Sequence, residues 1–204
     1  MDRALLAERL AERGEPAYRF DQVWRWTAGG ADGYEAMTNV PAALRAELER
    51  EVPFSTVGWL PGLRRFVDEV EQPIRLALSL HAPTDELRSE LMPVNDRYPL
   101  ADVLGECRRY VELRRRKVFV EYVMLAGVND RVEQARALAD LLDPKIFKVN
   151  LIPYNPTGMF EGSTPKAIAA FKDVLDRARL PATVRLTRGR DIAAACGQLA
   201  VSAT

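Results

Sequence analysis

The chain has 204 residues, of which 48% are hydrophobic and 28% charged, and its formal net charge is zero. This is globular composition with enough apolar material for a core. A zero net charge excludes long-range attraction of the whole chain to nucleic acid, so any such contact has to come from local basic clusters. With no secretory signal and no run of about 18–20 apolar residues, the sequence predicts a cytoplasmic protein that does not enter a membrane.

The first 54 residues are predicted to form a small all-helical module. Apolar residues with helical spacing predict helices over residues 4–13, 20–26 and 37–48. Asn39 is expected to cap the third helix, with Pro41 in its first turn. Arginines at 13, 19 and 25 make this module one of the two local basic clusters.

Strands alternate with helices from about residue 55 onward. Strands are predicted at 74–80, 118–124, 146–152 and 183–186, and helices at 59–71, 99–115, 131–142, 165–179 and 191–199. This order implies right-handed βαβ units and a parallel sheet. About four strands are too few for a closed eight-stranded barrel, so the predicted α/β fold of residues 55–204 is an open or partial barrel.

Two stretches of this second region are unusual. Residues 55–58 look like the end of a strand, yet almost no apolar strand precedes them, which indicates a missing segment at this junction. Residues 114–117, three arginines and a lysine, form the second basic cluster. That run is typical of a solvated helix end, where cations lie near the negative pole of the helix dipole, and a nucleic-acid contact is the alternative.

Polar residues at predicted strand ends are the candidate ligand groups. His81, the only histidine, follows a strand at the end where α/β barrels bind ligands, although a lone histidine is more often structural. Asn155 could hold a polar ligand through its amide, or be a turn residue before proline. Glu121 interrupts an apolar strand, so its carboxylate either faces a polar barrel mouth or pairs with an arginine.

The two cysteines have no metal-ligand spacing. Cys107 lies inside a helical pattern and is interpreted as a packing residue. Cys196 lies among alanines, and from the residues alone an inert, buried thiol is favoured over a reactive one.

Together, an ordered series of short motifs resembles the RlmN-type 23S rRNA and tRNA adenine methyltransferases. The resemblance covers nearly the whole chain, and the helical module is similar to the RNA-contacting domain of that family. The motifs are Tyr18–Trp24, Ser55–Gly58, Leu78–Pro83, Leu91–Asn95, Glu121–Leu125, Gly127–Asp130, Val149–Pro156 and Ala195–Leu199.

The resemblance implies a radical S-adenosylmethionine (SAM) barrel, with SAM and a [4Fe-4S] cluster as cofactors and 23S rRNA and tRNA as partners. In that family carbon 2 of an adenine is methylated. The matching positions assign SAM contacts to Ser55, to the segment Ser79, Leu80 and His81, and to Asn155. Cys196 matches the cysteine that first accepts the methyl group, which changes its interpretation from inert thiol to ancestral methyl carrier.

The sequence departs from the family at the junction between Phe54 and Ser55, where the central block with the three cluster cysteines is expected. Two cysteines cannot supply three thiolates, so we expect no metal ligands and a catalytically inactive chain. The alternatives are a module that binds RNA or SAM without catalysis, or one that works with a partner supplying the missing strands. Loss of early strands also predicts an exposed sheet edge that favours self-association.

Overall fold

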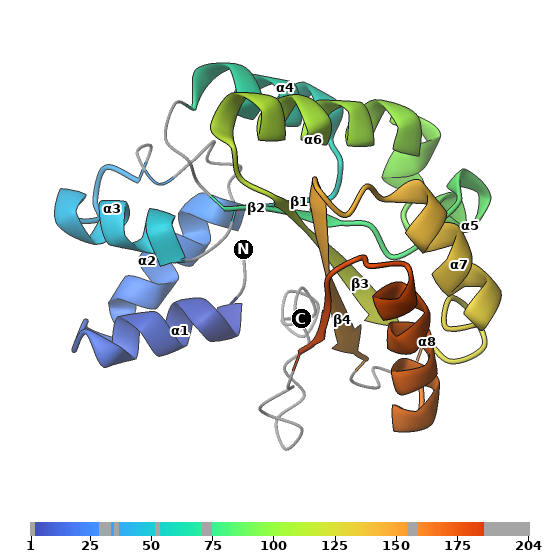
Figure 1. The fold of residues 1–204 in the computed structure, drawn as a ribbon. Coiled ribbons are helices and arrows are strands. Elements are labelled where there is room, and N and C mark those ends of the chain that lie inside the picture. The colour runs from blue at the N-terminus through green and yellow to red at the C-terminus, as the bar shows by residue number, and fades with distance from the viewer. Residues whose placement is uncertain are drawn as a thin grey trace.

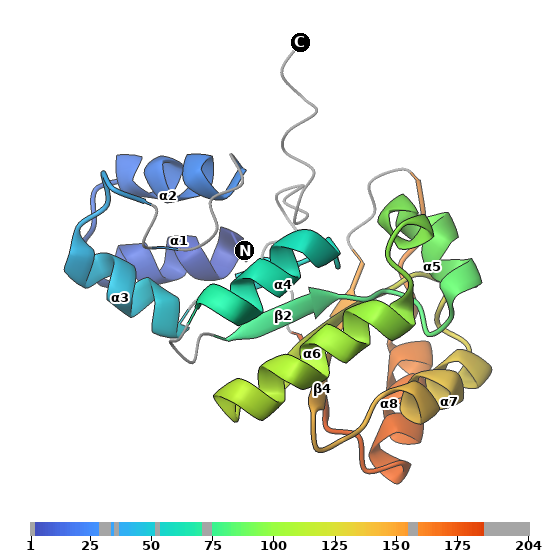
Figure 2. The same cartoon turned by 90° about the horizontal axis from the view of Figure 1, so that it is seen from above.

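The computed structural model describes residues 3–28, 34, 37–51, 54–70, 75–154 and 159–185. Over these residues a group of three helices precedes alternating strands and helices (Figure 1). The first group consists of α1 (Arg3–Glu12), α2 (Tyr18–Ala28) and α3 (Ala42–Glu51). Figures 1 and 2 both show these three helices gathered at one side of the sheet. No helix in the described ranges is long and apolar enough to cross a membrane.

The helical group has a hydrophobic core of its own. Its buried residues are Leu6, Leu10, Val23, Tyr34, Met37, Val40, Leu44 and Leu48. The prediction that Asn39 caps α3 is wrong, because the helix begins at Ala42 and Asn39 lies too far before it. Pro41 directly precedes the helix, and its carbonyl accepts a hydrogen bond from the Arg45 amide at 2.9 Å. The Asn39 Oδ1 instead accepts a hydrogen bond from Nε1 of Trp26 at 2.7 Å.

Within the described residues, the second part of the chain contains a sheet of five parallel strands in chain order. They are β1 (Phe54–Thr56), β2 (Leu76–Ser79), β3 (Val118–Met124), β4 (Phe147–Pro153) and β5 (Ala182–Val184). Parallel strands that neighbour each other in chain order are typical of a βα barrel. The described sheet is an open barrel, because β1 and β5 are its two edges. The predicted partial barrel is confirmed, but β1 is an additional strand. It has only three residues, and it overlaps residues 55–58, which look like a strand end in the sequence.

The helices that follow the strands are close to the predicted positions. They are α4 (Leu60–Glu69), α5 (Asp85–Leu91), the 3₁₀ turn η2 (Pro93–Asp96), α6 (Leu100–Arg114), α7 (Val132–Leu141) and α8 (Pro165–Arg177). Four of the five predicted helices are found, and the fifth, at 191–199, lies outside the described residues. The prediction missed α5, which is short and polar. Thr84 caps it by accepting a hydrogen bond from the Leu87 amide.

The two faces of the sheet differ in what they contact. On β3 the residues Val118, Val120, Tyr122 and Met124 are fully buried against the helices, and this side is called the covered face. The alternate residues Phe119, Glu121 and Val123 are half-buried on the other side, called the open face. Side chains of α4, α6, α7 and α8 complete the core over the covered face. The open face is therefore the side on which a ligand could lie.

The basic run at residues 114–117 lies at the beginning of β3, away from the carboxyl ends of the strands. Arg114 donates hydrogen bonds to the carbonyls of Val70 and Val67, at 2.7 and 3.1 Å, and so satisfies the end of α4. Residues 115–117 are exposed. The prediction of a solvated helix end is confirmed.

Candidate functional site

The candidate site lies at the carboxyl ends of β1, β2 and β3. Ser55 is opposite Ala77, and Ser79 is opposite Glu121, in the parallel register. Since side chains alternate along a strand, Ser55 and Ser79 both lie on the open face. Leu80 is different, because its side chain is fully buried in the core. Its amide and carbonyl are also engaged, with the Glu121 carbonyl and the Arg88 guanidinium.

His81 is held in one conformation and one tautomer. Its backbone φ is 59°, a left-handed conformation that a non-glycine residue adopts at a cost. Its Nδ1 accepts a hydrogen bond from the Val123 amide at 3.1 Å, so the ring proton of the neutral form is on Nε2. Burial, and secondly the charge of Arg88, lower the pKa of His81 to about 4. At neutral pH this side chain therefore offers an uncharged Nε2–H donor.

Asn129, which is fully buried, fixes the loop that carries His81. Its Nδ2 donates to the carbonyls of His81 and Val123, at 2.9 and 2.7 Å. Its Oδ1 accepts a hydrogen bond from the Leu125 amide at 2.8 Å. The loop after β3 and the loop after β2 are thus tied to each other through one amide side chain.

Arg88 of α5 joins the ends of β1 and β2 from within the core. It is fully buried, and it donates to the carbonyls of Val57 at 2.7 Å, Ser79 at 3.3 Å and Leu80 at 3.3 Å. Its fourth partner is Asn95 Oδ1, at 2.8 Å. Buried backbone carbonyls need such partners, so Arg88 determines where the two strand ends lie.

Gly58 gives Arg88 the space that it needs. A Cβ built on this glycine would lie 3.0 Å from the Arg88 Nη2 and 3.2 Å from Val103. The φ of Gly58 is 88°, a conformation that L side chains rarely adopt.

A line of polar side chains crosses the open face from β2 to β5. In the strand register Ser79 is opposite Glu121, Glu121 is opposite Asn150, and Asn150 is opposite Thr183. These four residues are called the polar row. Thr183 Oγ1 donates to Asn150 Oδ1 at 2.7 Å, and Asn150 Nδ2 donates to Glu121 Oε1 at 2.9 Å.

Glu121 is the one carboxylate of the polar row, and one of its oxygens lacks a partner. Its Oε2 is buried and has no hydrogen bond within the described part of the chain. Burial raises the pKa of Glu121, and the hydrogen bond from Asn150 opposes that rise. Of the two arrangements that the sequence left open, the open-face arrangement is correct, because within the described residues the carboxylate is bonded to Asn150 and to no arginine.

The cysteine predictions have different outcomes. Cys107 is fully buried in the core on α6, and burial raises the pKa of its thiol to about 12, so the packing interpretation is confirmed. Cys196 and Asn155 lie outside the described residues, and their roles stay predictions. Within the described ranges, no group of three His, Cys, Asp or Glu side chains could hold a metal ion.

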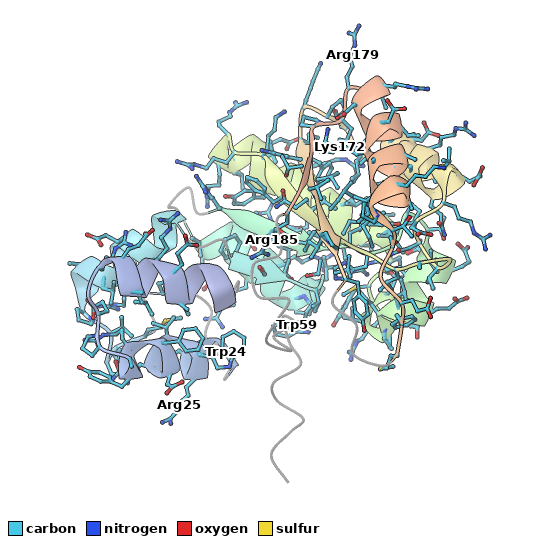
Figure 3. All side chains as sticks on the ribbon, turned by 90° about the horizontal axis from the view of Figure 1, so that it is seen from below. Trp24, Arg25, Trp59, Lys172, Arg179 and Arg185 are labelled. Carbon is cyan, nitrogen blue, oxygen red and sulfur yellow. The ribbon has the colours of Figure 1, made fainter. Side chains whose placement is uncertain are left out.

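The basic residues of the helical module are partly engaged inside it. Arg13 pairs with Glu47 and Arg19 with Glu15. Arg25 is exposed, and Figure 3 shows it projecting away from the ribbon. Exposed aromatic surface lies nearer the sheet, where the Trp59 side chain is 54% exposed directly before α4.

A groove of about 430 Å³ lies between α5 and α7, on the helical side of the molecule. Its lining includes Glu86, Glu90 and Glu133. Three carboxylates repel phosphate groups, so this groove does not suit a nucleic-acid backbone.

Comparison with known proteins agrees with this architecture. Residues 1–53 match the family described as the ribosomal RNA large subunit methyltransferase N-terminal domain. A probable dual-specificity RNA methyltransferase RlmN of Moorella thermoacetica is 50% identical over 152 residues, which are 74% of this chain and 43% of that protein. The corresponding protein of Caldanaerobacter subterraneus is 40% identical over 192 residues, 93% of this chain and 53% of that protein.

A solved structure is also similar. The crystal structure of a radical SAM methyltransferase from Sphaerobacter thermophilus aligns with a TM-score of 0.67 and 28% identity, covering 97% of each chain. The fold is therefore a partial barrel of the radical SAM methyltransferase class. Within that class the chain is an RlmN-type protein. It spans about half the length of the curated relatives that it matches.

Several residues that shape the site were not predicted from the sequence. Arg88 and Asn129 look like ordinary polar residues of a helix and a loop, and only their burial reveals their part in the site. Asn150 had a usable signal, because it interrupts a predicted apolar strand as Glu121 interrupts its own. Thr183, the first residue of its predicted strand, had none.

Proposed function

We propose that this chain is an RNA-binding and SAM-binding protein of the RlmN type that does not perform methyl transfer by itself. The observation that carries the proposal is a combination: the strand ends that would hold SAM are in place, while the cysteines needed for the cluster are not. The RNA substrates proposed by resemblance are 23S rRNA and tRNA.

Two features support an RNA contact through the helical module. Residues 1–53 match a family domain named for the ribosomal RNA large subunit methyltransferase. Arg25 is exposed on α2. Outside the module, Trp59 offers an exposed indole directly before α4. Cations bind phosphates, and aromatic rings stack on unpaired bases, so both side chains suit single-stranded RNA.

The open face supports a contact with SAM. Ser55 and Ser79 lie there together, and His81 is fixed next to them as a neutral donor. SAM carries hydroxyl, amino and carboxylate groups, and these side chains can donate to or accept from them. The residues present therefore fit SAM, which would supply the methyl group.

The [4Fe-4S] cluster does not fit the donor set. The chain has two cysteines, and such a cluster in this family takes three thiolates. Cys107 is enclosed in the core on the covered face. We propose that the central block of the family is missing between Phe54 and Ser55. The short β1, which is an edge strand, supports that proposal.

A second candidate function is a module that acts with a partner chain. The observation that favours it is the free side of β1, since the strand pairs only with β2 in the described sheet. An exposed edge of a parallel sheet can accept a further strand from another chain. Self-association through the same edge is the prediction made from the sequence.

The test begins with iron and sulfide analysis of the purified chain after anaerobic reconstitution. We expect no stoichiometric iron, and we expect S-adenosylhomocysteine to bind in calorimetry. Labelled tRNA should bind more weakly to Arg25→Ala than to the wild-type chain, with Arg136→Ala as a matched control because Arg136 is likewise an exposed arginine inside a helix, α7. Four iron atoms bound per chain would refute the inactive assignment, and failure to bind both ligands would refute the binding function.

A further inference from the structure

Glu121 leaves a buried carboxylate oxygen without a partner on the face where a ligand could lie. An unpaired buried acceptor costs free energy, so the structure contains a position for a hydrogen-bond donor that the described chain does not supply. Lys148 lies on the same face, but its Nζ is 5.7 Å from the centre of the Phe119 ring, in a cation–π contact.

The rest of the polar row determines what Glu121 can accept. Thr183 donates to Asn150, and Asn150 donates to Glu121 Oε1. Each side chain in this series of hydrogen bonds therefore orients its neighbour. The donation runs toward Glu121 and ends at its Oε1, which leaves Oε2 as the acceptor without a donor in the described chain. That oxygen is therefore held in place as an acceptor, with its partner oxygen already occupied.

Ser79 provides a second polar group next to that acceptor. Ser79 and Glu121 are directly opposite each other on neighbouring parallel strands, which are about 4.8 Å apart. A hydroxyl that donates and accepts thus lies beside a carboxylate oxygen that accepts. Two adjacent hydroxyl groups on a ligand have the matching pattern, whereas an ammonium group needs three acceptors and would leave one N–H unpaired.

From this arrangement we infer that the polar row binds the vicinal 2′- and 3′-hydroxyls of a ribose, with Glu121 as the acceptor and Ser79 beside it. Acidic side chains hold ribose hydroxyls in other nucleotide-binding folds for the same chemical reason. The inference rests on the proposed function and deepens it. The ligand class is a nucleoside whose 2′- and 3′-hydroxyls are both free, such as the adenosine part of SAM. A ribose inside RNA has no free 3′-hydroxyl and does not match the row.

The test is a calorimetric cycle on the full 204-residue chain. The probes are S-adenosylhomocysteine, adenosine, 2′-deoxyadenosine and adenosine 3′-monophosphate, and the variants are Glu121→Gln and, as a matched control on the exposed side of α6, Glu112→Gln. Glu121→Gln keeps the shape of the side chain and removes its charge. We expect the wild-type chain and the control to bind adenosine at least tenfold more tightly than 2′-deoxyadenosine.

In Glu121→Gln the preference for adenosine should fall below threefold, because removing the hydroxyl and removing the carboxylate eliminate the same contact. S-adenosylhomocysteine should bind this variant at least tenfold more weakly. A variant that keeps the full preference would overturn the inference and leave SAM binding intact. Equal, Glu121-dependent binding of adenosine 3′-monophosphate would also overturn it, because the ribose would then be one from RNA. A wild-type chain that binds none of the probes refutes the proposed SAM binding together with the inference.

Discussion

The covered face and the open face belong to the same five strands and have opposite chemistry. On the covered face β3 and β4 place Val120, Tyr122 and Phe147, all fully buried in one continuous core. On the open face the same strands place Glu121 and Asn150, hydrogen-bonded to each other and half-buried. Alternate residues of one strand can therefore serve different purposes. One set packs in the core and stabilises the fold, and the other presents polar groups to a ligand.

The largest difference between the faces should appear when an aromatic ring is removed from each. Phe147→Ala creates a cavity in the core and should lower the free energy of unfolding by about 4 kcal/mol. Phe119→Ala, on the open face, should lower it by about 1 kcal/mol because the ring is half-buried. Urea unfolding monitored by circular dichroism gives both values. Equal losses would show that the open face is covered in solution.

Arg88 fixes the carboxyl ends of β1 and β2, where the candidate site lies. Arg88→Met should lower the free energy of unfolding by about 3 kcal/mol, because the carbonyls of Val57, Ser79 and Leu80 lose a buried donor. The same urea measurement applies. Arg109→Met is the control, with a much smaller expected loss, because Arg109 is an exposed arginine on α6 whose ion pairs are with Asp68 and Glu106. If Arg88→Met unfolds at the urea concentration of the wild-type chain, the buried carbonyls have other partners.

His81 should make the stability of the chain sensitive to acid. Its pKa is about 4 in the folded chain, whereas an unperturbed histidine has a pKa of 6.5, so the unfolded chain takes up the proton first. Stability should therefore fall as the pH drops from about 6.5 to about 4, by at most about 3 kcal/mol. His81→Asn tolerates the left-handed backbone and should remove this dependence. Urea midpoints measured between about pH 4 and pH 7 test it, and parallel curves for both proteins would contradict it.

The smallest effect concerns the open face alone. Burial raises the pKa of Glu121, so the folded chain holds this proton more tightly than the unfolded chain, and that stability is lost as the pH rises through the folded pKa. Glu121→Gln should therefore gain stability relative to the wild type as the pH rises from 4 to 8. Thermal unfolding at the two pH values measures the difference. A variant that loses stability relative to the wild type over this range would indicate that the carboxylate has a partner.

Much of the fold could be predicted because it depends on local patterns. Four strands and seven helices follow from apolar periodicity, with boundaries displaced by a few residues. The elements with little apolar content were predicted less well. Only a strand end was recognised at β1, which has three residues, and α5, which is short and polar, was missed. The domain division at residue 54 stays a prediction, and Phe54 itself is the first residue of β1. The motifs also gave Ser55, Ser79 and His81, which the structure brings to the same end of the sheet.

The sequence by itself determined the class of fold, the helical module and the motifs that make this an RlmN-type chain. It also determined the cysteine count, since composition needs no coordinates. Only the tertiary structure decided that Arg88 and Asn129 hold the strand ends, and that Glu121 lies in a row with Asn150 and Thr183. The hydrogen bonds of Asn129 alone join residues between 4 and 48 positions apart in the chain. Burial and strand register create these contacts, and neither is a property of a short stretch of sequence.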